Sequence, residues 1–239
     1  MKKYILLMLL ILIISCTKKE IKIPTLDAKG IQEIHNHSQV WFFFEIKNND
    51  TIAKLNKKNT ISTTHWIYNI DKKLALKSII PSIIQLQDKH ANSMHSEEGM
   101  HDYFSYSDTI SKKLSFLEFD TVIFKTDSLT SKEYLKNHAR DYKNYKNINL
   151  TFTESKIWID DMPVEKKDFK TNILKIIEIS SSEKQRMLHL NFTENISYQG
   201  YLFYKTLINS IVNENIKTNN LEFIFNEEKV GFCYCLINE

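Results

Sequence analysis

The residues best suited to chemistry are histidines and methionines gathered in one polar stretch, residues 90–102. Imidazole and thioether ligands on a flexible loop suit copper in an oxidising compartment, and imidazole also suits zinc. Histidines spaced five and six residues apart in a polar loop are usually solvated, so we expect no cofactor, with copper or zinc as the alternative. The residues that would bind such a metal are His90, Met94, His95, Met100 and His101.

A second histidine pattern, His35-x-His37, precedes the first expected strand. Metal-dependent hydrolase barrels place such a pair at the end of a buried strand, and an eight-stranded barrel needs ~200 to 250 residues of alternating strands and helices. Because the pair precedes the strand here, the preferred prediction is a protein that is not an enzyme. The alternative is a metal-dependent hydrolase that uses His35, His37 and His65 with an unidentified acid.

Two cysteines, Cys233 and Cys235, alternate along an apolar segment near the end of the chain. On a strand, residues i and i+2 share one face, so both thiols point the same way. Three roles stay open for them. They are buried free thiols, a strained or redox-active disulfide that closes a very small ring, or two ligands of a metal that needs two more.

The third cysteine, Cys16, follows a signal sequence. Lys2 and Lys3 precede an apolar run, residues 4–14, whose helix would reach only about half of a ~30 Å hydrocarbon core. The segment from Ile13 to Cys16 resembles the lipobox of bacterial lipoproteins, which implies that residues 1–15 are cleaved and that Cys16 is acylated, for example with palmitate. Two or three acyl chains would anchor the protein to the inner or outer membrane, with its folded part in the periplasm or at the cell surface.

Composition excludes two classes of partner. The chain has only four Gly, and no two of them lie close enough to form a nucleotide-binding loop. Among its 32 basic residues only Arg140 and Arg186 are arginines, and loss of Lys2 and Lys3 lowers the formal net charge from +3 to +1. Nucleic-acid binding needs a concentrated basic face, so we expect neither nucleic acid nor nucleotide as a partner.

The elements that would position these residues begin after a short charged tether, residues 16–33. In a first module, residues 34–126, we expect strands at 39–46 and 62–70, separated by a turn at 47–50, and a helix at 78–89. A second helical pattern covers residues 103–119, and a short strand follows at 121–125. A helical connector, residues 127–147, opens with a capping box at Thr130 and Glu133.

The second module, residues 148–239, has clearer periodicity. It predicts a hairpin of strands 148–153 and 156–160, a helix at 165–179, a strand at 187–192, a helix at 197–216 and strands at 221–225 and 230–237. This order predicts an α+β fold in which helices pack on one face of a mixed sheet.

Shifting the chain by 90 residues aligns parts of the two modules. Ile83 falls on Ile173 at this shift. Further on, at a shift of 95 residues, the pair Tyr103 and Tyr106 corresponds to Tyr198 and Tyr201, with each pair expected to open a helix. The sequence thus predicts two tandem, related β-hairpin/α/β modules. The alternative is that any two strand-turn-helix units share this spacing.

Residues 148–225 resemble the periplasmic domain of the ExbD/TolR family of biopolymer-transport proteins. The residues that carry the likeness are the hairpin into Ile157 to Val164, the helix behind it, the helix start at Ser197 and Tyr198, and the strand Leu221 to Phe225. The resemblance implies a small α+β domain that dimerises, transmits force in the envelope and has no active site.

One departure from the family limits this comparison. Family members insert through one transmembrane helix that bears a proton-relaying Asp, whereas the apolar run here is the cleaved one and contains no acid. We therefore expect a lipid-anchored, non-enzymatic interaction or scaffold module whose partners are the membrane, envelope proteins and a second copy. The alternative is an envelope metal or small-ligand binding protein, or the hydrolase described above.

Overall fold

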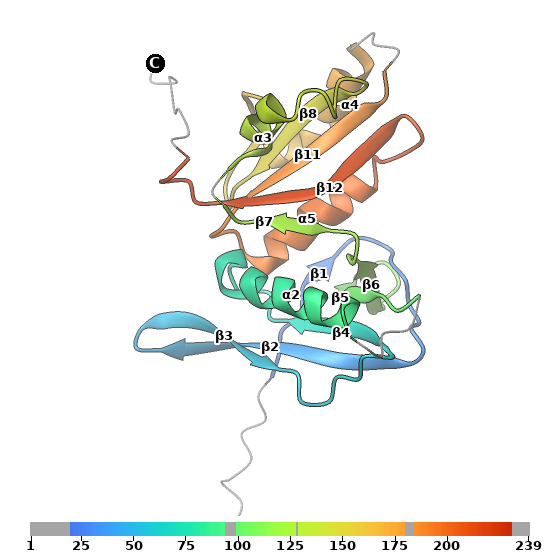
Figure 1. The fold of residues 1–239 in the computed structure, drawn as a ribbon, viewed down its shortest axis with the longest axis vertical. Helices are drawn as coiled ribbons and strands as arrows, with labels where there is room; N and C mark the ends of the chain where they lie inside the picture. Colours follow the sequence, from blue (N-terminus) through green and yellow to red (C-terminus); the bar gives the residue numbers. More distant parts are fainter. Residues whose placement is uncertain (1–19, 94–98, 128, 180–183, 231–239) are drawn as a thin grey trace, which may run out of the picture.

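The computed structural model describes residues 20–93, 99–127, 129–179 and 184–230. These residues form two six-stranded sheets and their helices, which confirms the predicted α+β class with two similar modules (Figure 1). Among the described residues, no helix is both long and apolar enough to cross a membrane.

The first sheet is built around three parallel strands, β2, β4 and β5. Its order is β1-β5-β4-β2-β3, with β6 added to β5. The helix α2 (Leu76–Ala91) covers one face of this sheet and confirms the helix expected at 78–89. The bounds are β1 (Thr25–Leu26), β2 (His37–Lys47), β3 (Asp50–Asn56), β4 (His65–Ile70), β5 (Asp102–Asp108) and β6 (Lys113–Glu118).

The helix predicted at residues 103–119 is wrong, because this segment is the β5–β6 hairpin. Strand β5 is buried on both faces, so its apolar residues follow each other without the alternation that marks an exposed strand. Between the strands, the Asp108 carboxylate accepts hydrogen bonds from the N–H groups of Ile110 and Ser111, and Lys112 has a φ of 56°. This turn chemistry interrupts the helical spacing.

The turn predicted at residues 47–50 is confirmed, but the strand that follows it, β3, was not predicted. Asn48 and Asn49 have φ of 52° and 66°. Two consecutive positive φ values are typical of a type I′ turn, whose twist matches that of the flanking strands. The turn therefore dictates an antiparallel hairpin, which β2 and β3 form.

The fold begins earlier than Ile34, within the segment that the sequence indicates as a tether. The backbone of Lys22 bonds to Asp71 and Lys72, and Leu26 is 2% exposed in the core. Further along, Ile31 bridges to Phe116. The stretch of chain that remains between Cys16 and the folded protein is therefore short.

The second sheet has the order β10-β9-β8-β11-β12-β7. The β8–β9 hairpin is antiparallel, while the four strands β8, β11, β12 and β7 run parallel to one another. Strand β7 confirms the short strand expected near residues 121–125, yet it pairs with β12 and so belongs to the second sheet. The bounds are β7 (Ile123–Lys125), β8 (Lys146–Phe152), β9 (Ile157–Ile159), β10 (Met162–Val164), β11 (Arg186–Thr193) and β12 (Ile216–Phe225).

Helices cover both faces of the second sheet, whereas the sequence predicts them on one face only. The helices α4 (Phe169–Ile179) and α5 (Tyr198–Asn209) pack on one face, where Phe152 contacts Phe169 and Tyr204. The short α3 (Ser131–Asn137), which begins with the predicted capping box, lies on the other face, where Ser131 bonds to Asn149 and Asn191. A 3₁₀ turn, η1 (Lys166–Asp168), leads into α4. The helix expected at 197–216 ends at Asn209, and the strand expected at 230–237 lies almost wholly outside the described residues.

The two modules share one arrangement. In each, a β-hairpin is followed by a strand parallel to its first member, then by a helix and another parallel strand. These elements are β2, β3, β4, α2 and β5 in the first module and β8, β9, β11, α5 and β12 in the second. The matching helices are α2 and α5, so the shift of 90 residues, which aligned α2 with α4, does not describe this correspondence. Tyr103 and Tyr106 lie in a strand and do not open a helix.

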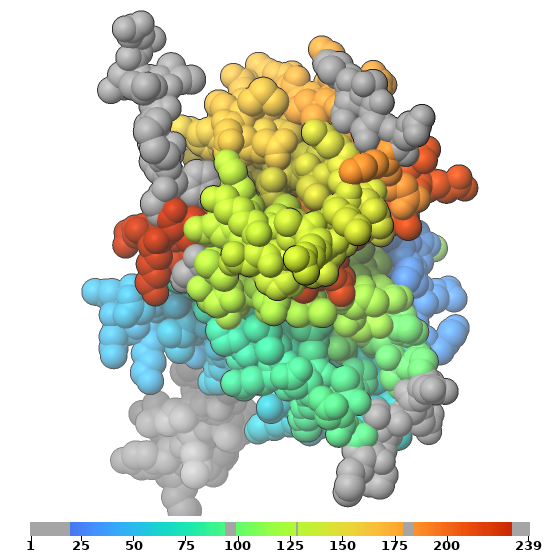
Figure 2. Space-filling model, turned by 45° about the horizontal axis from the view of Figure 1, so that its top comes forward, coloured from blue at the N-terminus to red at the C-terminus, as the bar shows by residue number. Residues whose placement is uncertain are grey.

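The modules meet where these two helices begin. Ala75 and Ser197, the N-cap residues of α2 and α5, form an antiparallel bridge. Tyr198 N–H donates to Leu74 O at 2.7 Å, and Leu76 N–H donates to Ile196 O at 3.1 Å. One apolar cluster runs through both modules, and the space-filling view shows them in broad contact (Figure 2).

Candidate functional site

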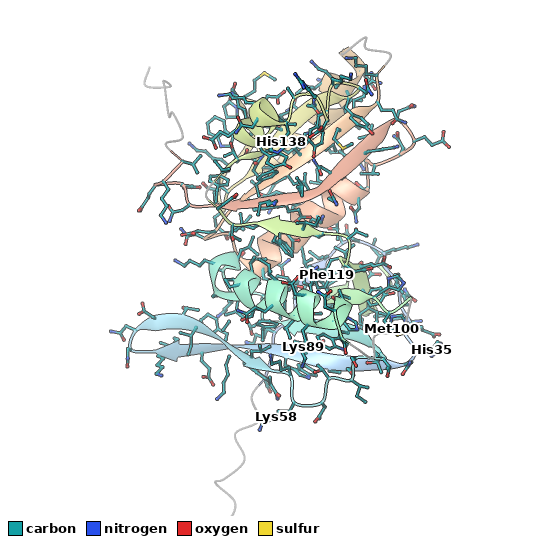
Figure 3. The ribbon with its side chains drawn as sticks, in the orientation of Figure 1. His35, Lys58, Lys89, Met100, Phe119 and His138 are labelled. Carbon is teal, nitrogen blue, oxygen red and sulfur yellow. The ribbon has the colours of Figure 1, made fainter. Side chains whose placement is uncertain are left out.

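The topology brings several histidines and acids to one end of the first sheet. The parallel strands β2, β4 and β5 begin at this end, so His37, His65 and His101 meet there, and His37 pairs with His65 in register. Helix α2 runs back toward the same end and delivers His90 near its last turn, while β6, antiparallel to β5, delivers Glu118. Figure 3 labels His35 and Met100 at this end of the sheet.

Three side chains at this end, His101, Glu118 and Asp120, form a group that we call the His101 triad. His101 Nδ1 lies 2.9 Å from Asp120 Oδ2 and 3.7 Å from Glu118 Oε1. One ligand atom from each residue lies within 4.8 Å of the others. All three side chains are partly exposed. The hydrogen bond to Asp120 raises the pKa of His101 above its ordinary value.

His65 contacts His101 and fixes its position in this triad. Its ring stacks against that of His101 with centroids 5.7 Å apart, and its Nδ1 accepts a hydrogen bond from the His101 backbone N–H at 3.0 Å. Burial, and then the neighbouring His101, lower the pKa of His65. A neutral His65 whose Nδ1 accepts must carry its proton on Nε2, so it positions His101 and has no free nitrogen lone pair for a metal.

His90 is buried in a different environment. Its Nδ1 lies 2.9 Å from Asp102 Oδ1, and its Nε2 lies 3.0 Å from the carbonyl oxygen of Thr64. The Trp66 ring stacks on the imidazole with centroids 4.2 Å apart. Burial raises the pKa of Asp102, although the bond to His90 opposes that rise. Both nitrogens of His90 are therefore engaged, and this pair links α2 to β5.

The structure brings together only part of the predicted metal-binding set. His101 joins an acid pair, whereas His90 cannot serve as a ligand, because both of its nitrogens are bonded. Met100 lies beside the cavity between α2 and the segment 120–124, which Asp102 and Asp120 also line. Met94 and His95 lie outside the described residues, as do Cys16, Cys233 and Cys235.

The sequence reasoning missed Glu118 and Asp120. It treated residues 103–119 as a helix, in which Glu118 has no relation to residue 101. In the β5–β6 hairpin, Glu118 pairs directly with Tyr103, two residues from His101. The signal that could have revealed this is the turn-forming segment from Asp108 to Lys112.

The histidines of the hydrolase alternative do not share a partner. His37 Nδ1 bonds to Ile34 O at 2.8 Å, while His65 Nδ1 bonds to the His101 backbone. His35 is exposed. Although His37 and His65 are neighbours in register, their imidazoles engage different groups.

A second polar cluster lies buried between the second sheet and the segment that contains α3. His189, fully buried, has Nε2 2.9 Å from Asn147 Oδ1 and Nδ1 3.0 Å from Asn219 Nδ2. Because the Asn219 amide donates to Nδ1, His189 is neutral in this arrangement, and burial lowers its pKa to about 4. Tyr142 also bonds to Asn219, so this cluster holds the connector on the sheet.

Comparison of the chain with protein families, with curated proteins and with solved structures finds no match.

Proposed function

We propose that this protein is a lipid-anchored component of a bacterial envelope that acts as a non-enzymatic interaction scaffold. Acylated Cys16 would hold it on the membrane, and its second module would be related to the ExbD/TolR domains that the sequence resembles. In support, the order of hairpin, helix, strand, helix and strand in residues 146–225 agrees with that resemblance.

One observation carries the scaffold proposal. Strand β3 pairs only with β2 among the described residues and so forms an edge of the first sheet. The two modules contact each other through the bridge between Ala75 and Ser197. An edge strand presents a row of backbone donors and acceptors that a partner strand can complete. A rigid body with such an edge is suited to hold an envelope protein or a second copy.

The anchor is tested by mass spectrometry of the protein purified from bacterial membranes. We expect a mature chain that begins at acylated Cys16, and Cys16→Ser should abolish both cleavage and acylation. An unmodified amino terminus at Met1 would contradict the anchor.

The scaffold is tested by a photo-crosslinking amino acid placed at Thr51 on the β3 edge. We expect one defined adduct at this site, either with a second copy or with one envelope protein. The matched control is the same group at exposed Asn137 at the end of α3. Equal labelling from both positions would contradict a specific edge.

A divalent metal site is a second candidate function, and the His101 triad is the observation that favours it. One imidazole and two carboxylates form a nitrogen and oxygen donor set, which suits zinc better than the copper that the alternative set of three histidines and two methionines would favour. His65 fixes the orientation of His101 through its backbone and ring contacts.

This candidate is tested by calorimetric titration of the purified chain with Zn²⁺. We expect His101→Ala and Asp120→Asn each to weaken binding at least tenfold, as loss of one ligand should. Exposed Glu165→Gln is the matched control and should leave the affinity unchanged. Equal affinities for all four proteins would eliminate the site.

A further inference from the structure

We propose that the open half of the outer face of the first sheet docks on the anionic phospholipid headgroups of the membrane that carries Cys16. This inference rests on the proposed acylation of that cysteine. The docking patch consists of Trp41, Phe43, Lys54, Lys57 and Lys58. It would determine which side of the protein faces the bilayer.

The chain between the anchor and the fold is short. The backbone of Lys22 is already hydrogen bonded, through its N–H to Asp71 Oδ2 at 3.1 Å and through its carbonyl to Lys72 N–H at 2.8 Å. Six peptide steps from Cys16 to Lys22 span at most about 21 Å. The acylated residue therefore cannot lie far from this point of the surface.

The chain joins the fold close to β2. Asp71, which holds Lys22, donates its own N–H to Phe42 O at 3.0 Å. Lys22 is thus two hydrogen bonds away from β2. The strand that carries Trp41 and Phe43 therefore lies close to the point where the chain joins the fold.

Two aromatic side chains lie on the outer face of β2. Because β2 alternates, Val40 and Phe42 are buried in the core beneath α2, while Trp41 and Phe43 point to the opposite face. Their rings stack with centroids 6.3 Å apart and remain partly exposed. Residues 27–36 cover the neighbouring half of this face, where Ile34 packs on Ile67. In the part of the chain that the structure describes, the half formed by β2 and β3 stays open.

Lysines border the two aromatic rings. A shallow groove beside Phe43 is lined by Lys54, Lys57 and Lys58, and a second groove places Lys58 beside Trp41. Lys54 also pairs with Glu45 at 3.5 Å, whereas Lys57 and Lys58 are exposed. Figure 3 shows Lys58 beyond the sheet on the side opposite α2.

This combination matches a membrane surface. Aromatic rings that are half exposed favour the headgroup level, and a lysine near an anionic surface contributes about a fivefold gain in binding. The chain between anchor and fold adds Lys18, Lys19 and Lys22 against one acid, Glu20. Charge and tether length therefore point to the same occupant, an anionic bilayer.

The orientation is tested with the mature lipoprotein reconstituted in vesicles of phosphatidylglycerol and phosphatidylcholine that contain brominated acyl chains. We expect quenching of tryptophan fluorescence that is largely lost in Trp41→Phe, because Trp66 is only 1% exposed. Trp158→Phe, in the second module, is the matched control and should keep the quenching. Equal quenching in all three proteins would overturn the proposal.

The charge contribution is tested with residues 16–239 carrying Cys16→Ser, which lack both the apolar signal segment and the acyl chains, and vesicles of phosphatidylglycerol. Lys57→Gln with Lys58→Gln should weaken binding about 25-fold and reduce its salt dependence. Lys136→Gln with Lys143→Gln, in the connector, should leave binding unchanged.

The two proposals fail in different ways. Vesicle binding through Lys57 and Lys58 by a chain whose Cys16 proves unmodified would support the patch and refute the anchor. An acylated chain with neither quenching nor lysine-dependent binding would refute the patch and leave the anchor intact. A dimer that dissociates on Trp41→Ala, without any vesicle signal, would assign the face to a second copy and overturn the proposal.

Discussion

At the scale of single residues, the surroundings of each histidine decide what it does. His101 lies between two carboxylates at the surface, His90 bonds through both nitrogens in the core, and His189 lies between two amides. The sequence identified His101 as a candidate but grouped it with His90. The spacing of residues along the chain carries no information about which ring nitrogens find partners.

His189 predicts a loss of stability in acid. Its pKa of about 4 in the fold lies below the ordinary value of 6.5, so the unfolded chain binds the extra proton more tightly. Stability from this residue is fully present above pH 6.5 and falls as the pH drops toward 4, by about 3 kcal/mol in total.

Urea unfolding at pH 7 and pH 4.5 checks this prediction. The wild-type protein should lose more stability over this interval than His189→Gln, which cannot titrate. Carboxylates contribute equally to both proteins, so the difference isolates the histidine. Identical pH dependence in the two proteins would refute the assignment.

Lys205 and Glu222 predict a second residue-scale effect, in the core of the second module. Their charged groups pair between α5 and β12, where Glu222 is fully buried and also accepts from Tyr201 Oη at 2.8 Å. Glu222→Gln should cost about 3–5 kcal/mol, because it leaves the ammonium group without its counter-charge.

The matched variant replaces both partners, Lys205→Met with Glu222→Leu, and should recover most of this loss. Chemical denaturation of Lys205→Met, of Glu222→Leu and of the double variant measures the coupling between the two residues. Additive losses would show that the pair is not coupled.

At the scale of elements, local rules predicted those elements whose pattern is periodic and whose caps are explicit. The capping box at Thr130 and the Asn-Asn turn at residues 48 and 49 both formed as expected. The β5–β6 hairpin was misread because its strands are covered on both sides, which removes the alternation. The packing of residues 22–34 could not be anticipated, because partners such as Asp71 for Lys22 and Phe116 for Ile31 lie 49 and 85 residues further along the chain.

Gly30 tests whether that amino-terminal segment is part of the fold. A Cβ at this position would lie 2.2 Å from Tyr106 Oη and 2.8 Å from Phe116 O, so Gly30→Ala forces the segment away from β5 and β6. We expect a loss of about 1–3 kcal/mol in unfolding free energy.

Thermal or urea unfolding measures this loss, with the exposed neighbour Lys29→Ala as the control. A loose tether would tolerate both substitutions equally.

At the scale of the whole molecule, the contacts between modules follow an approximate two-fold pattern. Lys77 N–H bonds to Glu194 O and Gln199 N–H bonds to Lys72 O, on either side of the bridge between Ala75 and Ser197. If Ala75 is equivalent to Ser197, then Lys77 is equivalent to Gln199 and Lys72 to Glu194. The two hydrogen bonds therefore join the same pair of positions, with donor and acceptor modules interchanged. Backbone N–H groups at the start of each helix, which an isolated module would leave exposed, thus find carbonyl partners in the other module.

This arrangement predicts that the modules unfold together. Ile196, fully buried at the junction, belongs to the cluster that spans both modules, so Ile196→Ala should cost about 2–5 kcal/mol. Hydrogen exchange should show protection falling to the same extent in β4 and in β11.

Ile123→Ala, at a side chain 48% exposed, is the control and should change little. Loss of protection confined to the second module would show two independent units.

The sequence by itself determined the class of the fold, most helices and strands, and the expectation of a lipid anchor, because these depend on periodicity, caps and local motifs. Only the tertiary structure decided that Glu118 and Asp120 join His101, that β7 leaves its module for the second sheet, and that the fold begins at Lys22. Each of these depends on contacts between distant residues. Strand pairing and burial select such contacts, and local patterns record them only in part, as the turn at Asp108 to Lys112 does for Glu118.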